Sequence, residues 1–510
     1  MGVEHIVNGV SLAAVSEVNS AEYDALVLVT TQDVAPPGAL REEVRAARAL
    51  DAGLDAAPAL LRCASVAGAR LVLAPTGPLT PYHDVRSVGE AARAGLQRAM
   101  AAGAQRPALV LQPHPLWPDA DLVALLGALE ALYVPLEIRE SFPDRGHKVQ
   151  ALGVYGEGLT GSLEDLLRDA AALERARAFA RDLGGADPER MTPLRAAQFI
   201  RETFAGGSVR VRVLDDRATI EREYPLLGAV NRAAATVERH RGCIVFLEYE
   251  PASYERTVLL VGKGVTYDTG GCDLKVGGVM AGMSRDKCGA AAIAGFLKAC
   301  DELKPALKVG AVLGMVRNSV GEDAYVADEL IRSRLGLPVR VGNTDAEGRM
   351  VMADLLAEMA GRAERERAPH LYTVATLTGH AGRAYGPGYT AAMDNHAAAW
   401  GGGHARALAA AGERLGDMLE VSRVRREDLA AHRGLGAGDA LLQAHNKPSS
   451  AMPRGHQAPA AFLMMAAGLD AGRVAYTHLD VAASAGEPPH QPTAAPLLAL
   501  AAHYGLLAKR

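Results

Sequence analysis

Hydrophobic and polar positions follow two alternating periods over the first 160 residues. Short apolar runs rich in β-branched residues predict strands, and stretches with a helical spacing of apolar residues lie between them. The predicted strands are residues 23–30, 70–74, 108–112 and 149–155, and the predicted helices are residues 41–49, 88–102 and 121–132. Strands that alternate with helices in this way predict a mostly parallel sheet covered by helices.

The same alternation resumes after a long polar stretch. Residues 162–183 are charged and alanine-rich, which predicts a helix, and Gly-Gly-Ala-Asp-Pro at 184–188 predicts its end. The later strand candidates are residues 209–214, 243–249, 258–262, 309–316, 339–341, 371–377 and 475–480. We see no internal repeat between these segments.

The length of the chain bounds its domain organisation. At 510 residues it exceeds what one ordinary hydrophobic core accommodates, so two domains are expected. We predict an α/β protein in which a smaller N-terminal α/β domain (1–160) is joined by a linker helix (161–190) to a larger C-terminal α/β domain (191–510).

Composition excludes several classes of protein. Hydrophobic residues make up 49% of the chain and charged residues 22%, which is typical of a globular protein. A net charge of −5 supplies no bulk attraction to nucleic acid or anionic membrane. The five cysteines contain no C-x-x-C pair and indicate reduced thiols. The N-terminus lacks the basic and apolar regions of a signal peptide, so we expect a cytoplasmic protein with no membrane partner.

Candidate chemistry first appears at residues 341–355, which read V-G-N-T-D-A-E-G-R-M-V-M-A-D-L. Asp345 and Glu347 are two residues apart, so in an extended backbone both carboxylates would project to one side, with Arg349 further along that side. Residues 350–360 then predict a helix, because they contain no glycine or proline. A strand end that turns into a helix is where α/β proteins tend to place chemistry.

A second cluster precedes it in the glycine-rich residues 258–293, which contain Lys263, Asp268, Lys275 and Asp286. One interpretation is a surface loop with solvated charges. Against it, Lys263 directly follows an apolar strand, where a charge is costly unless it is paired or functional. Four carboxylates in one pocket require positive charge to offset them, and divalent metal ions supply it. A lysine joins such a site only as a neutral amine.

The spacing Lys263-x4-Asp268-x6-Lys275-x10-Asp286, together with N-T-D-A-E-G-R at 343–349, resembles the leucyl aminopeptidase family, also called cytosol aminopeptidases. The resemblance covers about residues 180–510, including T-L-T-G at 376–379 and H-L-D-V-A at 478–482. It implies a mixed sheet carrying a di-metal site and a metal-dependent aminopeptidase that releases N-terminal amino acids from peptides. It also implies a homohexamer and two zinc or manganese ions per chain.

Carried over residue by residue, the resemblance implies a role for each matching position. Lys275 would polarise the scissile carbonyl, and Arg349 would hold a bicarbonate ion that shuttles a proton. The implied metal ligands are Lys263, Asp268, Asp286, Asp345 and Glu347. The implied substrate-binding residues are Met283, Thr376, Leu377 and Gly379.

Some positions depart from the family pattern. Lys287 and Cys288 replace Met-Gly after Asp286 and could weaken or re-tune metal affinity, while Asp273 could lower the acidity of Lys275. The alternative function is therefore a catalytically impaired family member that acts as a hexameric scaffold or a nucleic-acid-binding regulator. His478 and Asp480 could be a metal pair, although we favour a buried hydrogen-bonded pair.

Overall fold

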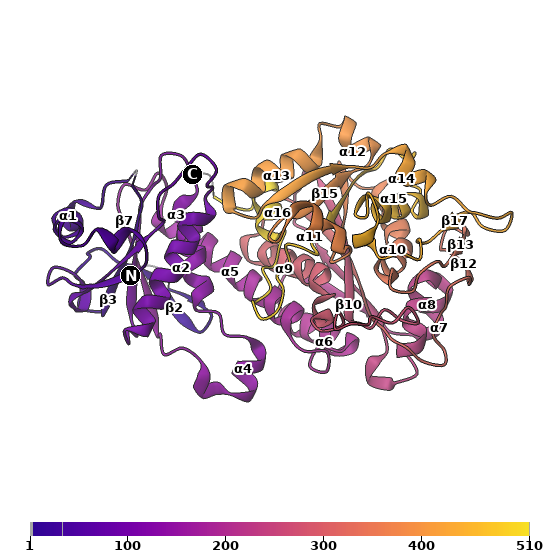
Figure 1. Ribbon diagram of the computed structural model, residues 1–510, viewed down its shortest axis with the longest axis horizontal. Coiled ribbons are helices and arrows are strands. Elements are labelled where there is room, and N and C mark those ends of the chain that lie inside the picture. Colours follow the sequence, from indigo (N-terminus) through magenta and orange to yellow (C-terminus); the bar gives the residue numbers. More distant parts are fainter. Residues whose placement is uncertain (1–3, 33, 509–510) are drawn as a thin grey trace. The chain divides into compact units, whose positions relative to one another are not determined.

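The computed structural model describes residues 4–32 and 34–508 and divides into two compact units. The first unit comprises Met1–Ala178, Ala411–Gly416 and Gly505–Arg510, and the second comprises Phe179–Ala410 and Asp417–Tyr504. Figure 1 shows the course of the chain through both units. None of the helices in the described ranges has the length and apolar character needed to cross a bilayer.

The first unit is built on a seven-stranded sheet in the order β1-β2-β7-β6-β3-β5-β4. The five central strands are parallel, and β1 and β4 pair antiparallel at the two edges. The strands are β1 (His5–Val7), β2 (Val10–Ala14), β3 (Ala25–Thr30), β4 (Ala59–Arg62), β5 (Arg70–Pro75), β6 (Pro107–Leu111) and β7 (Ala151–Gly156). The prediction of a mostly parallel sheet is confirmed.

Helices of the first unit supply apolar side chains to this sheet. Every residue of β3 is buried, as expected for a central parallel strand covered on both faces. The helices are α1 (Arg41–Leu50), α2 (Arg86–Ala101), α3 (Ala120–Ala131) and α4 (Leu136–Ser141). Helix α5 (Leu163–Gly185) then runs from the first unit into the second.

The second unit contains an eight-stranded mixed sheet in the order β16-β15-β18-β14-β10-β11-β9-β8. Strands β18, β14, β10 and β11 are parallel neighbours, whereas β15, β9 and β8 join by antiparallel pairing. The strands are β8 (Val209–Leu214), β9 (Cys243–Tyr249), β10 (Thr257–Asp268), β11 (Lys308–Asn318), β14 (Pro369–Ala375), β15 (Thr390–Asp394), β16 (Leu419–Arg423) and β18 (Ala475–Asp480). The predicted mixed sheet is confirmed.

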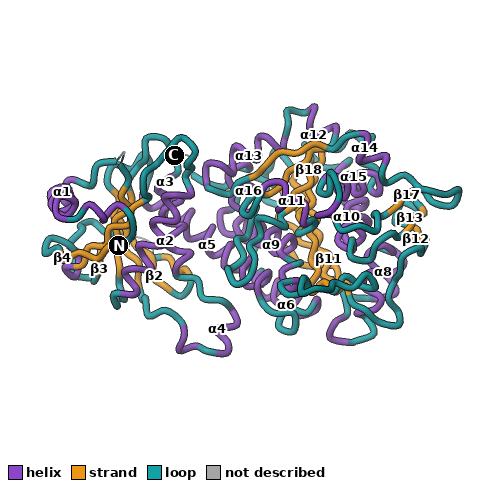
Figure 2. Tube along the Cα trace, in the orientation of Figure 1, coloured by secondary structure: helices purple, strands orange, loops and turns teal. Residues whose placement is uncertain are grey.

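Helices cover both faces of this sheet (Figure 2). Consecutive positions of β10 show the two faces: a side chain at Gly262 would meet Ala290 of α9, whereas Lys263 lies against Gly348 of α10. The helices of the second unit are α6 (Pro193–Thr203), α7 (Arg217–Glu223), α8 (Pro225–Ala234), α9 (Cys288–Leu303), α10 (Glu347–Ala363), α11 (Gly379–Tyr385), α12 (His396–Trp400), α14 (Arg426–Ala430), α15 (Gln457–Ala466) and α16 (Leu497–His503). Helix α13 (His404–Leu415) begins in the second unit and ends in a segment that belongs to the first. A small sheet joins β12 (Leu330–Arg332), β13 (Pro338–Arg340) and β17 (Leu441–Leu442).

Candidate metal centre

The candidate residues gather at the carboxyl edge of the parallel strands in the second unit. Asp268 and Asn318 are the last residues of β10 and β11, and Thr376 directly follows β14. Parallel strands end at a common edge, so side chains far apart in the sequence meet there. This edge is the frame on which the site is built.

The backbone around Asp345 and Glu347 differs from the predicted extended strand. The Asn343 side chain accepts a hydrogen bond from Asp345 N at 2.7 Å, which forms a turn, and Glu347 is the first residue of α10. The prediction that Asp345, Glu347 and Arg349 share one side of an extended chain is therefore wrong. The two carboxylates still converge, because each forms an ion pair with a lysine from the earlier cluster.

Lys263 is the buried centre of one half of the site and is only 3% exposed. Its Nζ lies 2.7 Å from Asp286 Oδ1 and 2.8 Å from Glu347 Oε1, and it donates to the Thr376 carbonyl oxygen at 2.8 Å. Burial acts to lower the pKa of Lys263, but the surrounding carboxylates outweigh burial and raise that pKa above its ordinary value. Two carboxylates within ion-pair distance favour the charged ammonium form of Lys263.

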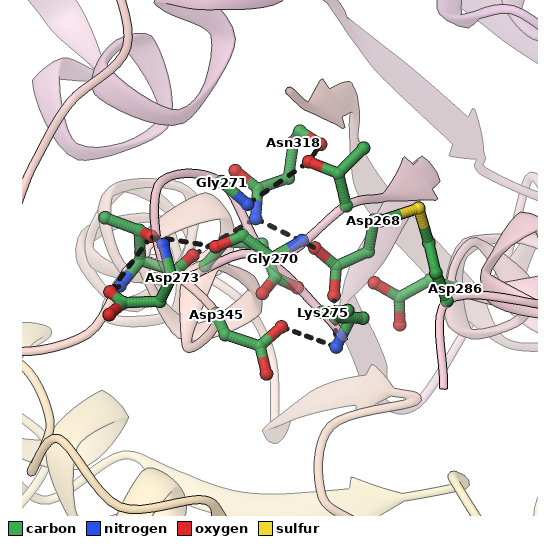
Figure 3. Close-up of polar contacts among 12 residues, drawn as sticks. Asp268, Gly270, Gly271, Asp273, Lys275, Asp286, Asn318 and Asp345 are labelled. Carbon is green, nitrogen blue, oxygen red and sulfur yellow. Dashed lines mark hydrogen bonds and ion pairs between the residues drawn. The ribbon is translucent and has the colours of Figure 1, made fainter. Parts of the chain in front are cut away.

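Lys275 occupies the other half of the site, between two further carboxylates. Its Nζ lies 2.5 Å from Asp345 Oδ1 and 3.0 Å from Asp268 Oδ2 (Figure 3). Burial acts to lower the pKa of Lys275, whereas Asp268, Glu347 and Asp345 together raise it above the ordinary value. Sequence reasoning placed both lysines beside the carboxylates, and the structure brings them together.

The carboxylates form a group that suits a cation. Asp268, Asp286 and Glu347 each offer one oxygen, and these three atoms lie within 4.8 Å of one another. Burial raises the pKa of Asp268 to about 7 and that of Asp286 well above its usual range. Asp286 Oδ2 is buried without a hydrogen-bond partner among the described residues. Hard oxygen donors with an unused lone pair are ligands that divalent metals take, so the residues fit a metal site.

Arg349 is buried in the first turn of α10, and within the described chain it forms no salt bridge. Its Nη1 donates to the Gln443 carbonyl oxygen at 3.1 Å, and its Nε has no hydrogen-bond partner there. Burial lowers the pKa of this guanidinium to about 10. A buried guanidinium with an unused donor is suited to hold a planar anion.

The predicted substrate-binding residues lie on segments beside the carboxylates. The Thr376 hydroxyl donates to Asp286 Oδ1 at 2.8 Å, and Leu377 N donates to Asp480 Oδ1 at 3.2 Å. Gly379 begins α11, and Met283 begins a short 3₁₀ helix, Met283–Arg285, just before Asp286. Thr376 is thus in direct contact with the acidic group. Leu377 and Gly379 follow Thr376 closely in the chain, and Met283 closely precedes Asp286.

The Lys287 side chain points away from Asp286, which directly precedes it in the chain. Its side chain is fully buried, and Nζ donates to the carbonyl oxygens of Ala186, at 2.9 Å, and Ser284. Burial lowers its pKa to about 8 and raises that of the Cys288 thiol to about 11. The Cys288 Sγ contacts the Gly184 carbonyl oxygen at 3.8 Å. Both departures from the family pattern therefore pack against the end of α5.

His478 and Asp480 are both buried, but they do not form the predicted pair. His478 Nδ1 bonds to the Thr373 hydroxyl at 2.7 Å, while Asp480 accepts the Thr378 hydroxyl at 2.6 Å. The prediction that they bond to each other is wrong, because each finds its own partner across the sheet or in the next turn.

Sequence reasoning missed the residues that brace the carboxylates. Asn318 Nδ2 donates to Asp268 Oδ1 at 2.8 Å and to the Thr344 carbonyl oxygen at 3.1 Å. The Tyr325 hydroxyl donates to the same carbonyl oxygen at 2.9 Å. Thr344 lies inside the N-T-D-A-E-G-R run and could have been suspected from it. No local signal marks Tyr325.

Comparison with known proteins decides the family. The catalytic-domain pattern of the cytosol aminopeptidase family matches residues 178–501, which is more than half of the chain. The chain belongs to the cytosol aminopeptidase family. This cytosol aminopeptidase family member is 41% identical over 505 residues to a Caenorhabditis elegans protein named as a putative aminopeptidase, covering 96% of each chain. It is also 31% identical over 375 residues to a Polaromonas protein named as a probable cytosol aminopeptidase, covering 72% of this chain and 71% of the relative.

A solved structure shares the fold of this cytosol aminopeptidase family member over nearly its whole length. The bottromycin maturation enzyme BotP, in complex with Mn, superimposes with a TM-score of 0.76 at 25% sequence identity. The match covers 95% of this chain and 99% of BotP. Family membership supports a metal-dependent aminopeptidase, a hydrolase, as the class of this protein.

Proposed function

We propose that this protein is a di-metal aminopeptidase that releases N-terminal amino acids from peptides. The observation that carries the proposal is the buried group of Asp268, Asp286 and Glu347, whose oxygens lie within 4.8 Å of one another beside two lysines. Family membership supports the class of reaction, and the unused Asp286 Oδ2 supports a bound cation.

Five residues would hold two divalent ions: Lys263, Asp268, Asp286, Asp345 and Glu347. Bound ions of this type lower the pKa of water toward neutrality and polarise a carbonyl group. Zinc and manganese are both candidates, and the likeness to BotP, whose structure was solved in complex with Mn, supports manganese. Lys263 would join as a neutral amine and would release its ammonium proton to solvent, because the cation would then offset the charge of the carboxylates.

Lys275 and Arg349 would act on the reacting groups. Lys275 Nζ is held by Asp345 and Asp268 beside the acidic group, where it would donate to the oxyanion that develops on the scissile carbonyl. Arg349, with an unused Nε, would hold a bicarbonate ion that accepts and returns a proton. Both roles use charge that the fold has already positioned.

Four residues would bind the first residue of the peptide. Met283, Thr376 and Gly379 would shape the pocket for its side chain, and the Leu377 carbonyl would accept from its backbone. The Thr376 hydroxyl bond to Asp286 supports this, because Thr376 contacts the acidic group directly. The catalytic domain we propose is residues 191–510, with an N-terminal domain at 1–160 and a linker helix at 161–190.

Assembly and location extend the proposal. We propose that the protein is a homohexamer, which family membership supports. We also propose a cytoplasmic location, which is supported by a cysteine content without C-x-x-C pairs. Sedimentation or mass photometry of the purified protein tests the hexamer, and a stable monomer at micromolar concentration would contradict it.

Metal content and hydrolysis together test the function. The purified protein, stripped with chelator and reloaded with zinc or manganese, is expected to bind two ions per chain and to hydrolyse dipeptides and leucine anilide. A protein that binds no metal and stays inert on several dipeptides and amides would instead be the impaired scaffold. A salt-dependent mobility shift of DNA tests the regulator alternative, and no shift is expected from a chain of net charge −5.

A further inference from the structure

Asp273, an exposed carboxylate outside the group of proposed metal ligands, connects the turn that carries Lys275 to the turn that carries Asp345. Asp273 lies in the glycine-rich turn after β10, two residues before Lys275. Its Oδ2 accepts a hydrogen bond from Thr344 N at 2.7 Å, and Asp273 N donates to Thr344 Oγ1 at 2.7 Å. Thr344 immediately precedes Asp345. Asp273 and Thr344 thus form a reciprocal pair of bonds between segments 71 residues apart in the sequence.

The rest of the turn is shaped to allow this contact. Thr344 Oγ1 donates to the Gly270 carbonyl oxygen at 2.7 Å. Gly270 and Gly271 both have positive φ, at 88° and 64°. A Cβ at Gly270 would lie 2.5 Å from the Asp273 carbonyl oxygen, and one at Gly271 would lie 2.9 Å from Thr344 Oγ1. Only glycine allows the two segments to approach so closely.

The contact bears directly on the distance between Lys275 and Asp345. Lys275 N donates to the Thr269 carbonyl oxygen at 2.9 Å, so the turn is closed between its ends. One end carries Asp273 and Lys275, and the opposing segment carries Thr344 and Asp345. The 2.5 Å separation of Lys275 Nζ and Asp345 Oδ1 therefore depends on how the two segments are docked.

We propose that Asp273 is a positioning residue, which through Thr344 holds the turn carrying Lys275 against the turn carrying Asp345. The inference rests on the proposed function, because it assigns Asp273 the placement of Lys275 for catalysis. It differs from the sequence hypothesis that Asp273 alters the acidity of Lys275, since the bonds of Asp273 run to Thr344.

Kinetics of Asp273→Ala test the role in the metal-loaded protein. We expect kcat to fall about 10- to 100-fold with KM within about threefold, because a small displacement of an aligned group costs turnover more than binding. Asp273→Asn keeps an acceptor oxygen for Thr344 N and is expected to retain most of the activity. Thr344→Val removes the hydroxyl bonds of the same contact. The kcat of the double variant Asp273→Ala/Thr344→Val should therefore lie only a little below that of either single variant. Metal stoichiometry is expected to stay at the wild-type value.

Amide hydrogen exchange supplies a readout that does not depend on activity. In metal-free Asp273→Ala, exchange is expected to rise in the peptides that cover residues 269–276 and 343–347, and to stay unchanged elsewhere. Asp51→Ala is the matched control, since Asp51 in the other unit is an exposed carboxylate that accepts a backbone N–H from Gly53 at 2.8 Å. It should alter neither kcat nor exchange in the two site segments.

The outcomes separate the two proposals. If Asp273→Ala keeps wild-type kcat and wild-type exchange, the positioning role is overturned while the aminopeptidase stands. Loss of metal from Asp273→Ala also overturns it, because the residue would then act on metal retention. If the wild-type protein itself hydrolyses no peptide, the proposed function fails, and exchange alone decides whether Asp273 docks the two segments.

Discussion

Lys263 Nζ lies 2.8 Å from Glu347 Oε1, and both side chains are almost fully buried, with relative exposures of 4% and 2%. The pair joins the middle of β10 to the first residue of α10. Asp286 shares the same ammonium at 2.7 Å. A single buried lysine therefore compensates two carboxylates, and its removal takes from each the ammonium group that contacts it.

Lys263→Met is expected to destabilise the metal-free protein strongly. Removal of one partner of a buried ion pair lowers the free energy of unfolding by about 3–5 kcal/mol, because the remaining charge stays desolvated. Chemical denaturation in the presence of chelator measures the loss. Lys298→Met is the control: Lys298 pairs with Glu302 at 3.3 Å where both side chains keep some contact with water, and pairs open to solvent contribute about 1 kcal/mol or less. Equal stability of Lys263→Met and wild type would contradict the buried ion-pair description.

Asp345→Asn is expected to remove activity and leave the fold intact. The change is nearly isosteric but deletes a charged oxygen that faces Lys275 at 2.5 Å. Removal of one preorganised charged partner at a reacting centre typically costs about 100-fold or more in kcat. Turnover of a dipeptide and the melting temperature are measured together. The exposed Asp470→Asn should match wild type in both, and near-normal turnover of Asp345→Asn would rule out Asp345 as a metal ligand.

Lys287→Met is expected to lower stability without lowering metal content. The buried amine donates to the carbonyl oxygens of Ala186 and Ser284, and loss of the donor leaves those acceptors unpaired, at a cost of about 1–3 kcal/mol. Metal stoichiometry and kcat should equal the wild-type values, because the amine is directed away from Asp286. The exposed Lys148→Met provides the control. A large change in metal affinity would revive the hypothesis that Lys287 re-tunes the site.

Two histidines shielded from water, His370 and His503, are expected to make the protein acid-sensitive. Burial, with smaller effects of His404 and Arg256, lowers the pKa of His503 to about 4, and burial lowers that of His370 well below its ordinary value. An unfolded histidine binds a proton near pH 6.5, whereas these folded ones do not until lower pH. The free energy of unfolding should therefore fall as pH drops below about 6.5, by up to about 1.4 kcal/mol per pH unit for each histidine.

Substitution of one histidine measures its share of that slope. His370→Gln removes a titrating group whose ring lies 4.0 Å from the ring of His404. The free energy of unfolding of this variant should therefore change less steeply with pH than that of wild type, by the contribution of about one bound proton. Unfolding midpoints between about pH 7 and pH 5 supply the comparison. His490→Gln, at an exposed position, should keep the wild-type slope, and an unchanged slope in His370→Gln would contradict the assignment.

The sequence alone determined the elements whose signals are local. The strands at 209–214, 243–249 and 475–480 begin and end where their apolar patterns predict, because burial on a sheet imposes that pattern on consecutive residues. The spacing of Lys263, Asp268, Lys275 and Asp286 likewise identifies four of the candidate site residues from the sequence alone.

Only the tertiary structure decided the directions of the side chains. Asp345 and Glu347 lie in a turn and at a helix start, where an extended strand was expected, since the Asn343 side chain bonds to Asp345 N. The direction of Lys287 toward Ala186 depends on the packing of α9 against the end of α5. The partner of Asp273 lies 71 residues further along the chain. Such contacts arise when whole elements dock, and no local periodicity encodes which surfaces meet.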